Sequence, residues 1–202
     1  EIAQSMALNN NHLATFWMHN GHINVEGIKM SKSLGNFILA KDFIQNNKAN
    51  VVKLAMFKTH YRLPFNIKEE LFKECSMLDD KIYNTLKQAN LKIQIDGTLI
   101  KQITQDENIN KIMDEDFNTP NLITYLLELL KELNMALRSN GEIGSLYDKI
   151  NLIINILGLH YDLKTLNADD KKIYQEWLEA KANKDYNKAD ELRKTLVKEE
   201  IL

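Results

Sequence analysis

The spacing of hydrophobic residues is helical over most of the chain, from Ala40 onward. The clearest stripe lies within residues 67–89, where apolar side chains recur at steps of three or four. Its members are Leu71, Cys75, Leu78, Ile82, Leu86 and Ala89. This period places them on one face of a helix that packs against a core. Before Ala40, Gly21, Gly27 and Gly35 interrupt shorter apolar runs, so we expect loops and strands there.

Two of these shorter runs favour strands. Residues 16–19 (FWMH) and 22–26 (HINVE) are rich in aromatic and β-branched side chains. The Glu26–Gly27 pair is a hairpin turn candidate between the second run and residues 28–30 (IKM). The pattern therefore predicts a small α/β piece ahead of a helical bundle.

Punctuating residues predict where the C-terminal helices begin and end. Thr119 is expected to cap a helix that starts at Pro120 and continues through Leu137. That helix is apolar on more than one side, which is typical of a helix at the centre of a bundle. Ser145 is expected to cap the next helix, and Gly158 to end it.

The last helices form a predicted pair. Asn167 with Asp170 indicates the start of a helix over residues 168–183, and residues 184–199 form a second short helix. Earlier in the chain, the DFNTP segment, residues 116–120, is interpreted as a turn and cap that aligns two bundle helices.

Composition narrows the class of protein. The chain has 202 residues, 44% of them hydrophobic, which is enough for one domain or two small ones with a real core. Basic and acidic residues number 26 and 28, so net charge points to no particular partner.

Cys75 is the only cysteine, which excludes an internal disulfide, and we interpret it as a buried core thiol. No apolar run approaches about 20 residues, and no signal peptide is visible, so we expect no membrane association. Because the chain starts at Glu1 and not at Met, we expect a fragment or a trimmed product.

One stretch carries candidate chemistry: GIKMSKSLGN, residues 27–36. Lys29 and Lys32 lie among small hydroxyl residues, and Gly35 allows backbone amides to approach a ligand. Mobile ammonium groups, hydroxyls and accessible N–H groups together form a clamp for a polyanion such as pyrophosphate. The simpler alternative is a solvated turn whose lysines have no special role.

The segment KMSKS, Lys29 to Ser33, matches the second signature of class I aminoacyl-tRNA synthetases. The segments EIAQS, FWMHNGHINVEGIKMSKSLGN, HYR, MDEDFNTP and AKANKDYNKADELR occur in this order, and this set resembles cysteinyl-tRNA synthetases. The resemblance implies a mainly α fold: the end of a Rossmann-type catalytic domain, followed by a helical tRNA- and anticodon-binding region. It divides the chain into the end of the catalytic domain (1–40), stem-contact helices (41–65), a bundle (66–162) and the start of an anticodon-binding domain (163–202).

What the resemblance implies for chemistry is the ATP-dependent activation of L-cysteine to cysteinyl-adenylate, and its transfer to the 3′ end of tRNA(Cys). Lys29 and Lys32 would be the catalytic cations, with Lys32 contacting ATP in the transition state. Ser31 and Ser33 would shape the same loop and bind ATP, which carries Mg²⁺. The backbone around three further residues would contact the adenine ring: Gly21, His22 and Ile23.

The resemblance also implies a zinc ion that holds the substrate thiolate, with two cysteines, a histidine and a glutamate as ligands. Glu1 matches that glutamate, and the other ligands are expected upstream of this chain. We therefore expect the chain alone to be inactive. His19 and His22 are not interpreted as a metal pair, because no cysteine or carboxylate cluster completes a site.

The tail resembles the anticodon-reading part of the family, and by that similarity Lys181 and Asp190 are the candidates for tRNA binding. Lys184, Tyr186 and Arg193 lie nearby and offer phosphate contacts and a stacking ring. A solvated helical hairpin without RNA contacts is the alternative interpretation.

The expected enzyme is a cytoplasmic cysteine–tRNA ligase, a monomer or a weak dimer. Two alternatives remain open at the level of sequence. One is a non-catalytic helical RNA-binding module that retains the loop, and the other is a paralogous cysteine ligase that uses a sugar amine as acceptor.

Overall fold

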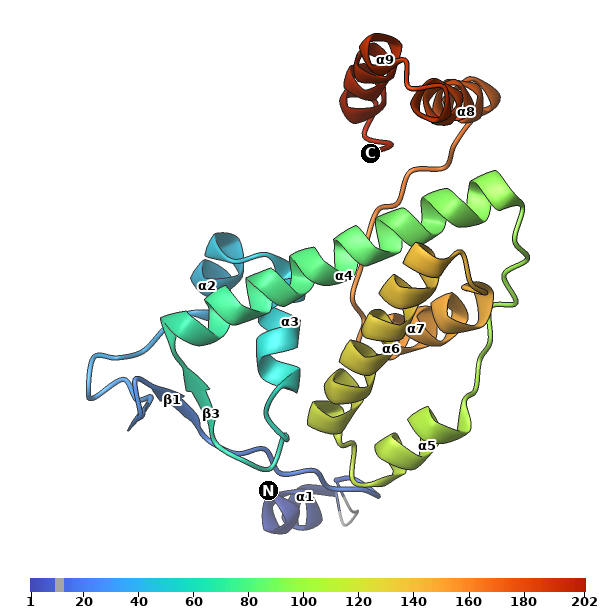
Figure 1. The fold of residues 1–202 in the computed structure, drawn as a ribbon. Helices are drawn as coiled ribbons and strands as arrows, with labels where there is room; N and C mark the ends of the chain where they lie inside the picture. The colour runs from blue at the N-terminus through green and yellow to red at the C-terminus, as the bar shows by residue number, and fades with distance from the viewer. Residues whose placement is uncertain (10–12) are drawn as a thin grey trace.

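The computed structural model describes residues 1–9 and 13–202, and the fold of these residues is mainly helical, as expected (Figure 1). The helices are α1 Ile2–Asn9, α2 Ala40–Asn46, α3 Ala49–Phe57, α4 Glu69–Asp96, α5 Glu107–Asp114, α6 Thr119–Ser139, α7 Gly144–Ile156, α8 Ala168–Ala182 and α9 Tyr186–Lys198. The strands are β1 Ile23–Val25, β2 Ile28–Lys29 and β3 Phe65–Ile67, in the order β2-β1-β3. None of the helices in the described ranges combines the length and apolar character that crossing a membrane requires.

The predicted hairpin is confirmed. β1 and β2 pair antiparallel, with Asn24 opposite Lys29 and Val25 opposite Ile28. Glu26 and Gly27 form the two-residue turn, and both have positive φ angles, 50° and 80°. Two successive positive φ angles characterise the turn type that matches the twist of paired strands.

Two expectations for the N-terminal part are wrong. Residues 16–19 form no strand, and the Phe16 side chain is 88% exposed. β1 has β2 on one side and β3 on the other, so β1 offers residues 16–19 no free edge. β3, which pairs parallel to β1, occupies residues expected to lie at or before the start of a helix. The long helix therefore begins at Glu69, not at Ile67, and it also extends beyond Ala89 to Asp96.

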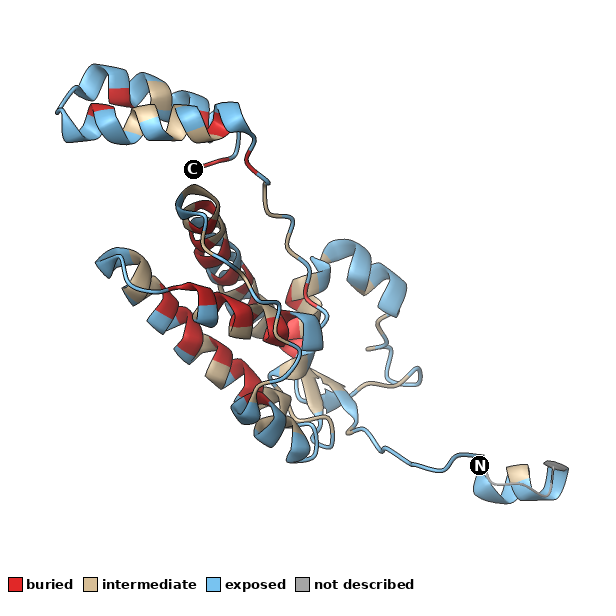
Figure 2. Ribbon diagram, turned by 90° about the vertical axis from the view of Figure 1, so that its right-hand side faces the viewer, coloured by how far each residue is buried: buried red, intermediate tan, exposed pale blue. Residues whose placement is uncertain are grey.

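The main core lies where α3 packs on α4, and α6 packs on both α4 and α7. Leu54, Ile82, Leu126 and Ile153, one from each of these helices, are completely buried. Cys75 belongs to the same core and is also completely buried, which confirms its interpretation as a core thiol. Figure 2 shows buried residues concentrated in these helices, whereas the N-terminal segment is exposed.

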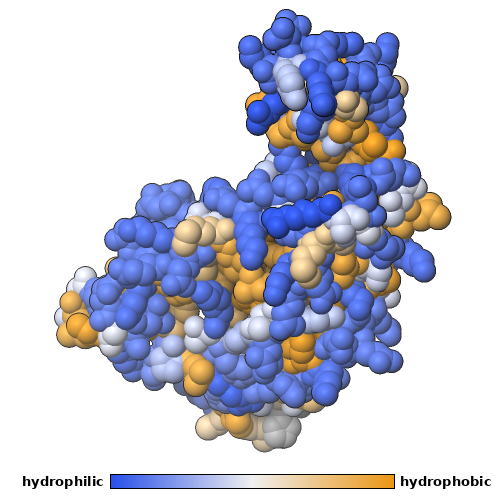
Figure 3. All heavy atoms as spheres, in the orientation of Figure 1, coloured by the Kyte–Doolittle hydropathy of each residue, from blue (hydrophilic) through white to orange (hydrophobic). Residues whose placement is uncertain are grey.

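A second, smaller core holds the α8–α9 hairpin against the C-terminal end of α4 (Figure 1). It is formed by Leu91, Leu166, Leu196 and Ile201. Polar contacts reinforce it, since the side-chain amides of Asn90 and Gln94 on α4 both donate to the carbonyl of Lys164. Figure 3 shows hydrophobic atoms at the base of this hairpin, and further hydrophobic areas on the main body among hydrophilic atoms.

The predicted helix caps are correct in part. Pro120 lies in the first turn of α6 as expected, but the capping side chain belongs to Asn118, not Thr119. Ser145 does not cap α7: it lies inside the helix, and its N–H donates to the Glu142 carboxylate at 3.1 Å. In both cases a neighbouring side chain of the preceding turn reaches the free amides of the first turn.

The C-terminal helix signals are confirmed. Asn167 and Asp170 form a reciprocal capping box: the Asn167 side chain accepts from the Asp170 N–H at 2.8 Å, and the Asp170 carboxylate accepts from the Asn167 N–H at 3.2 Å. Asp185 caps α9. Gly158 has a φ of 60°, as expected for a glycine after the end of a helix.

Candidate functional site

The cationic loop is a closed turn that leaves the end of the β1–β2 hairpin. Its first residue after β2, Met30, donates its N–H to the Ile23 carbonyl of β1 at 2.9 Å, so the loop is attached to the sheet. Asn36 closes the loop: its side chain accepts from the Ser31 N–H at 2.9 Å and donates to the Lys29 carbonyl at 3.3 Å. These bonds fix the ends of the loop while its tip stays at the surface.

The side chains of this loop face solvent. The hydroxyls of Ser31 and Ser33 lie 3.2 Å apart, and the Lys32 ammonium lies 5.7 Å from the centre of the Phe37 ring. Lys29 is also exposed. Neither lysine takes part in the ion pairs found among the described residues, so both charges are free to meet an anionic ligand.

The backbone before β1 lies against the segment that leads into β3. The Gly21 N–H donates to the Tyr61 carbonyl at 2.8 Å, and the Phe65 N–H donates to the His22 carbonyl at 2.9 Å. A Cβ atom on residue 21 would collide with the Leu63 carbonyl, so only glycine fits this approach. The structure thus brings Gly21, His22 and the cationic loop together at one small sheet.

Three consecutive residues of this segment converge on one carboxylate, Asp116, in the turn between α5 and α6. The Tyr61 hydroxyl donates to Asp116 Oδ1 at 2.6 Å, and Arg62 donates from Nε to Oδ2 at 2.5 Å and from Nη2 to Oδ1 at 3.1 Å. His60 Nε2 lies 2.9 Å from the Asp116 carbonyl oxygen. The Arg62 guanidinium and the Tyr61 hydroxyl lower the pKa of Asp116 to about 2, which keeps this carboxylate ionised.

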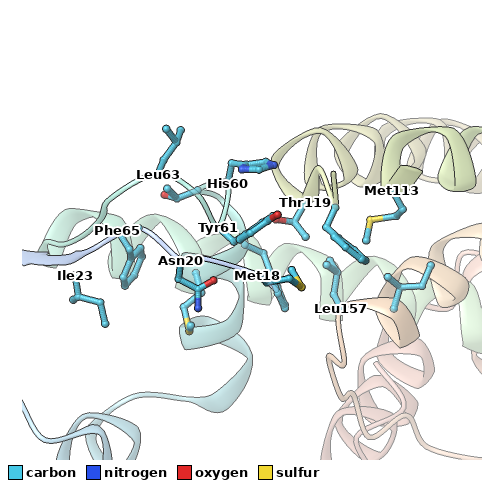
Figure 4. Close-up of a pocket in the computed structure, with 16 residues that line it drawn as sticks. Met18, Asn20, Ile23, His60, Tyr61, Leu63, Phe65, Met113, Thr119 and Leu157 are labelled. Carbon is cyan, nitrogen blue, oxygen red and sulfur yellow. The ribbon is translucent and has the colours of Figure 1, made fainter. Parts of the chain in front are cut away.

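A mostly apolar cavity of about 440 Å³ opens between the small sheet and the bundle (Figure 4). Asn20 and Tyr61 line it from the sheet side, and Met113 and Thr119 from α5 and α6. The DFNTP segment is confirmed as a turn between two helices, and its residue Phe117 also lines the cavity.

A second groove, of about 470 Å³, lies on the α8–α9 hairpin. It brings together the two predicted tRNA-binding residues, Lys181 and Asp190, both exposed. Trp177 forms part of its wall, with the Lys181 ammonium 4.3 Å from the ring centre, in the geometry of a cation–π contact. Tyr186, 68% exposed, and Arg193 complete the polar lining.

The described residues of this chain do not by themselves fit a zinc site. Within the ranges that the structure describes, no three or more histidine, cysteine, aspartate or glutamate side chains gather in an arrangement that would hold a metal ion. Glu1 is exposed and offers one carboxylate, whereas a tetrahedral site takes three or four protein ligands. His19 stacks on Trp17 with ring centres 6.5 Å apart.

Comparisons with known proteins match two regions of the chain. Residues 1–78 match the family model for the tRNA synthetases class I (C) catalytic domain, and residues 108–161 match the DALR domain model. The whole chain aligns at 36% identity, over 217 positions, with the cysteine–tRNA ligases of Oceanobacillus iheyensis and of Staphylococcus aureus (strain JH9). Over its whole length the chain is similar to part of these cysteine–tRNA ligases. It covers 46% and 47% of these two relatives and corresponds to their C-terminal portion, so it spans about half the length of the curated relatives it matches.

The catalytic-domain match includes the sheet, the cationic loop and the first turns of α4, and the DALR match includes α6, α7 and nearly all of α5. The contacts of Tyr61 and Arg62 with Asp116 therefore join the two matched regions.

Sequence analysis missed three residues of the site. Asn36 closes the cationic loop, and its place directly after Gly35, at the end of the loop, was an available signal. Trp177 lies four residues before Lys181 on one helix, a spacing that places the two side chains on the same face. The partnership of Asp116 with residues 60–62 carries no local signal, because more than fifty positions separate them.

Proposed function

We propose that this chain is the part of a cysteine–tRNA ligase that carries the phosphate-binding loop and the tRNA-binding helices. The reaction is the attack of the cysteine carboxylate on the α-phosphate of ATP, which forms cysteinyl-adenylate and releases pyrophosphate. A hydroxyl of the terminal ribose of tRNA(Cys) then takes the cysteinyl group, and AMP is released. One observation carries the proposal: the Lys29–Ser33 loop is held in shape by Asn36 with both ammonium groups unpaired, in a chain that aligns throughout with cysteine–tRNA ligases.

In this proposal the loop stabilises the charge that develops on the leaving pyrophosphate, whose Mg²⁺ arrives with ATP. Lys32 and Lys29 donate from mobile ammonium groups, and the hydroxyls of Ser31 and Ser33 can donate to phosphate oxygens from the same side. Such a clamp accelerates the reaction because its contacts are stronger in the transition state than with bound ATP. The chemistry needs positioning and charge more than a general base on this chain.

The adenine ring is proposed to bind at the start of β1. The carbonyl of Gly21 and the N–H of His22 have no hydrogen-bond partner among the described residues, and they lie next to each other along the backbone. The two groups belong to one trans peptide and point in opposite directions, so one of them at a time can bind the ring edge. Either the Gly21 carbonyl accepts from the exocyclic amine of adenine, or the His22 N–H donates to a ring nitrogen. The side chain of Ile23, 41% exposed, offers the ring an apolar contact.

Zinc and tRNA binding complete the proposal. Glu1 contributes one ligand to a zinc ion whose other ligands lie outside this chain; the ion selects the cysteine thiolate.

On the α8–α9 hairpin, Lys181 and Asp190 read bases of the tRNA, because a groove with two aromatic rings, basic groups and a carboxylate suits an unstacked base. The division of the chain at residues 40, 65 and 162, the cytoplasmic location, and the monomer or weak dimer belong to the same proposal.

The test is cysteine-dependent ATP–pyrophosphate exchange by a ligase-length protein, in which this chain follows an N-terminal half like that of its relatives. Lys32→Ala should lower the exchange rate by about 10²–10³, the usual effect of removing one donor to a developing charge. Lys131→Ala is the matched control, since Lys131 is an exposed lysine on α6 far from the loop in sequence, and it should leave the rate unchanged. If the wild-type protein shows no cysteine-dependent ATP–pyrophosphate exchange, or if Lys32→Ala does not reduce it, the proposal is contradicted. A non-catalytic RNA-binding module is then favoured.

The acceptor is tested separately. With the adenylate formed, transfer of labelled cysteine to tRNA(Cys) supports the ligase, and Lys181→Ala should weaken that transfer while leaving ATP–pyrophosphate exchange intact. Transfer to an amino sugar in place of tRNA would identify the paralogous ligase. The aromatic groove on the α8–α9 hairpin favours RNA, since Trp177 and Tyr186 offer stacking surfaces beside basic side chains.

A further inference from the structure

Residues 60–62, in the segment between α3 and β3, all contact one residue of the turn between α5 and α6. Asp116 accepts hydrogen bonds from Tyr61 and, in a two-point contact, from Arg62, and its carbonyl oxygen lies beside His60. A bidentate contact of this kind fixes orientation as well as distance. Asp116 itself belongs to the turn between α5 and α6, so it attaches the segment to the bundle.

The same segment holds the start of β1 from its other side. Tyr61 accepts from the Gly21 N–H at 2.8 Å, and the Phe65 N–H donates to His22 at 2.9 Å. The side chain of Tyr61 thus binds Asp116 while its backbone binds Gly21. A shift of this segment would move the backbone that the proposed function assigns to adenine.

The position of Asp116 is not explained by core packing. Its side chain is 44% exposed, so the carboxylate fills no core space. Asp116 and Phe117 both have φ angles of 55°, in the left-handed region that residues other than glycine rarely adopt. Strained backbone of this kind persists where surrounding contacts determine it, and it is common near functional sites.

We propose that Asp116 is a positioning residue for ATP: through Tyr61 and Arg62 it holds the backbone at Gly21 and His22 in the geometry that binds the nucleotide. This inference rests on the proposed function. It adds a residue of the helical bundle, far from the cationic loop in sequence, to the machinery for adenylate formation. Asp116 acts through its partners and does not touch the substrate.

The kinetic test uses Asp116→Asn in the ligase-length protein. The neutral amide keeps the size of the side chain but loses the ionic contact with Arg62. We expect the KM for ATP to rise about five- to tenfold, as for other positions that couple to a site without contacting the ligand. The KM for cysteine should stay within about twofold, because the cysteine site lies elsewhere. Asp80→Asn is the matched control, since Asp80 also pairs with one cation, Lys48, at the surface.

Epistasis separates positioning from general destabilisation. Tyr61→Phe removes one of the contacts, and the double variant Tyr61→Phe/Asp116→Asn should raise the KM for ATP by less than the product of the two single effects, because both act on one segment. Additive effects, an ATP KM that Asp116→Asn leaves unchanged, or equal increases for ATP and cysteine would each overturn the inference.

A structural readout needs no enzyme activity. In the 202-residue chain, Asp116→Asn should accelerate hydrogen exchange of the Gly21 amide, whose partner is the Tyr61 carbonyl, while amides in the middle of α6 keep their protection. An unchanged Gly21 amide overturns the positioning role itself. A wild-type protein without cysteine-dependent exchange instead overturns the proposed function and, with it, the link between this positioning and ATP.

Discussion

Asp116 and Phe117 show how much of this site depends on individual backbone conformations. Both residues have positive φ angles, and together they direct the Asp116 carboxylate toward Tyr61 and Arg62 and place Phe117 in the wall of the cavity. Gly21 shows the opposite case, in which the absence of a side chain allows two backbone segments to touch. At this scale the site is built from close approaches that single substitutions would disturb.

The lone cysteine leads to a prediction at the same scale. Burial raises the pKa of the Cys75 thiol, and the side chain is completely inaccessible. The folded chain should therefore react with a thiol reagent much more slowly than the unfolded chain, because both access and the thiolate fraction are reduced. The measurement is the rate of thiol titration with and without denaturant. Equal rates in the two states would show that the helices packed on α4 do not cover Cys75.

Among the elements, helix ends separate local from non-local causes. The capping box of Asn167 and Asp170 lies within four residues, and the sequence predicts it correctly. At α6 and α7 the predicted caps Thr119 and Ser145 are displaced by neighbouring side chains. Strand β3 was missed altogether, because it is a strand only by virtue of its pairing with β1, whose residues lie about forty positions earlier.

The capping box gives a prediction for α8. Asn167→Ala removes the side chain that accepts from the Asp170 N–H, and it should destabilise the α8–α9 hairpin by about 1 kcal/mol. Asn187→Ala, an exposed site inside α9, is the matched control and should change stability by less than about 0.5 kcal/mol. Urea unfolding followed by Trp177 fluorescence in a Trp17→Phe background measures both, and equal effects of the two substitutions would contradict the capping role.

At the scale of the whole molecule, α4 connects the two ends of the protein. It begins directly after β3, next to the cationic loop's sheet, and its far end packs in the second core with the α8–α9 hairpin (Figure 1). The helix has 28 residues, about 42 Å at 1.5 Å per residue. The proposed nucleotide site and the proposed base-reading groove are thus joined by one continuous element.

The two separate cores lead to the prediction for the whole molecule. Leu196→Ala should destabilise the hairpin by about 2–5 kcal/mol, because Leu196 is completely buried in the smaller core. In a Trp17→Phe background, Trp177 fluorescence should then report an earlier unfolding transition, while the helical circular dichroism of the main bundle keeps its midpoint. Leu196→Met is the volume-conserving control and should cost less than about 1.5 kcal/mol. A common shift of both signals would mean that the two cores unfold as one unit.

The sequence by itself determined the helical bundle, the hairpin turn at Glu26–Gly27, the capping box and the cationic loop. Each of these depends on side chains within a few positions of one another. Their hydrophobic period, turn preference and charge can be read from neighbouring residues in the sequence. Only the tertiary structure decided the pairing of β3 with β1, the convergence of residues 60–62 on Asp116, and the attachment of the hairpin to the far end of α4. These contacts join residues tens of positions apart. The residues next to a strand edge, a carboxylate or an apolar face in the sequence do not indicate which distant partner it will contact.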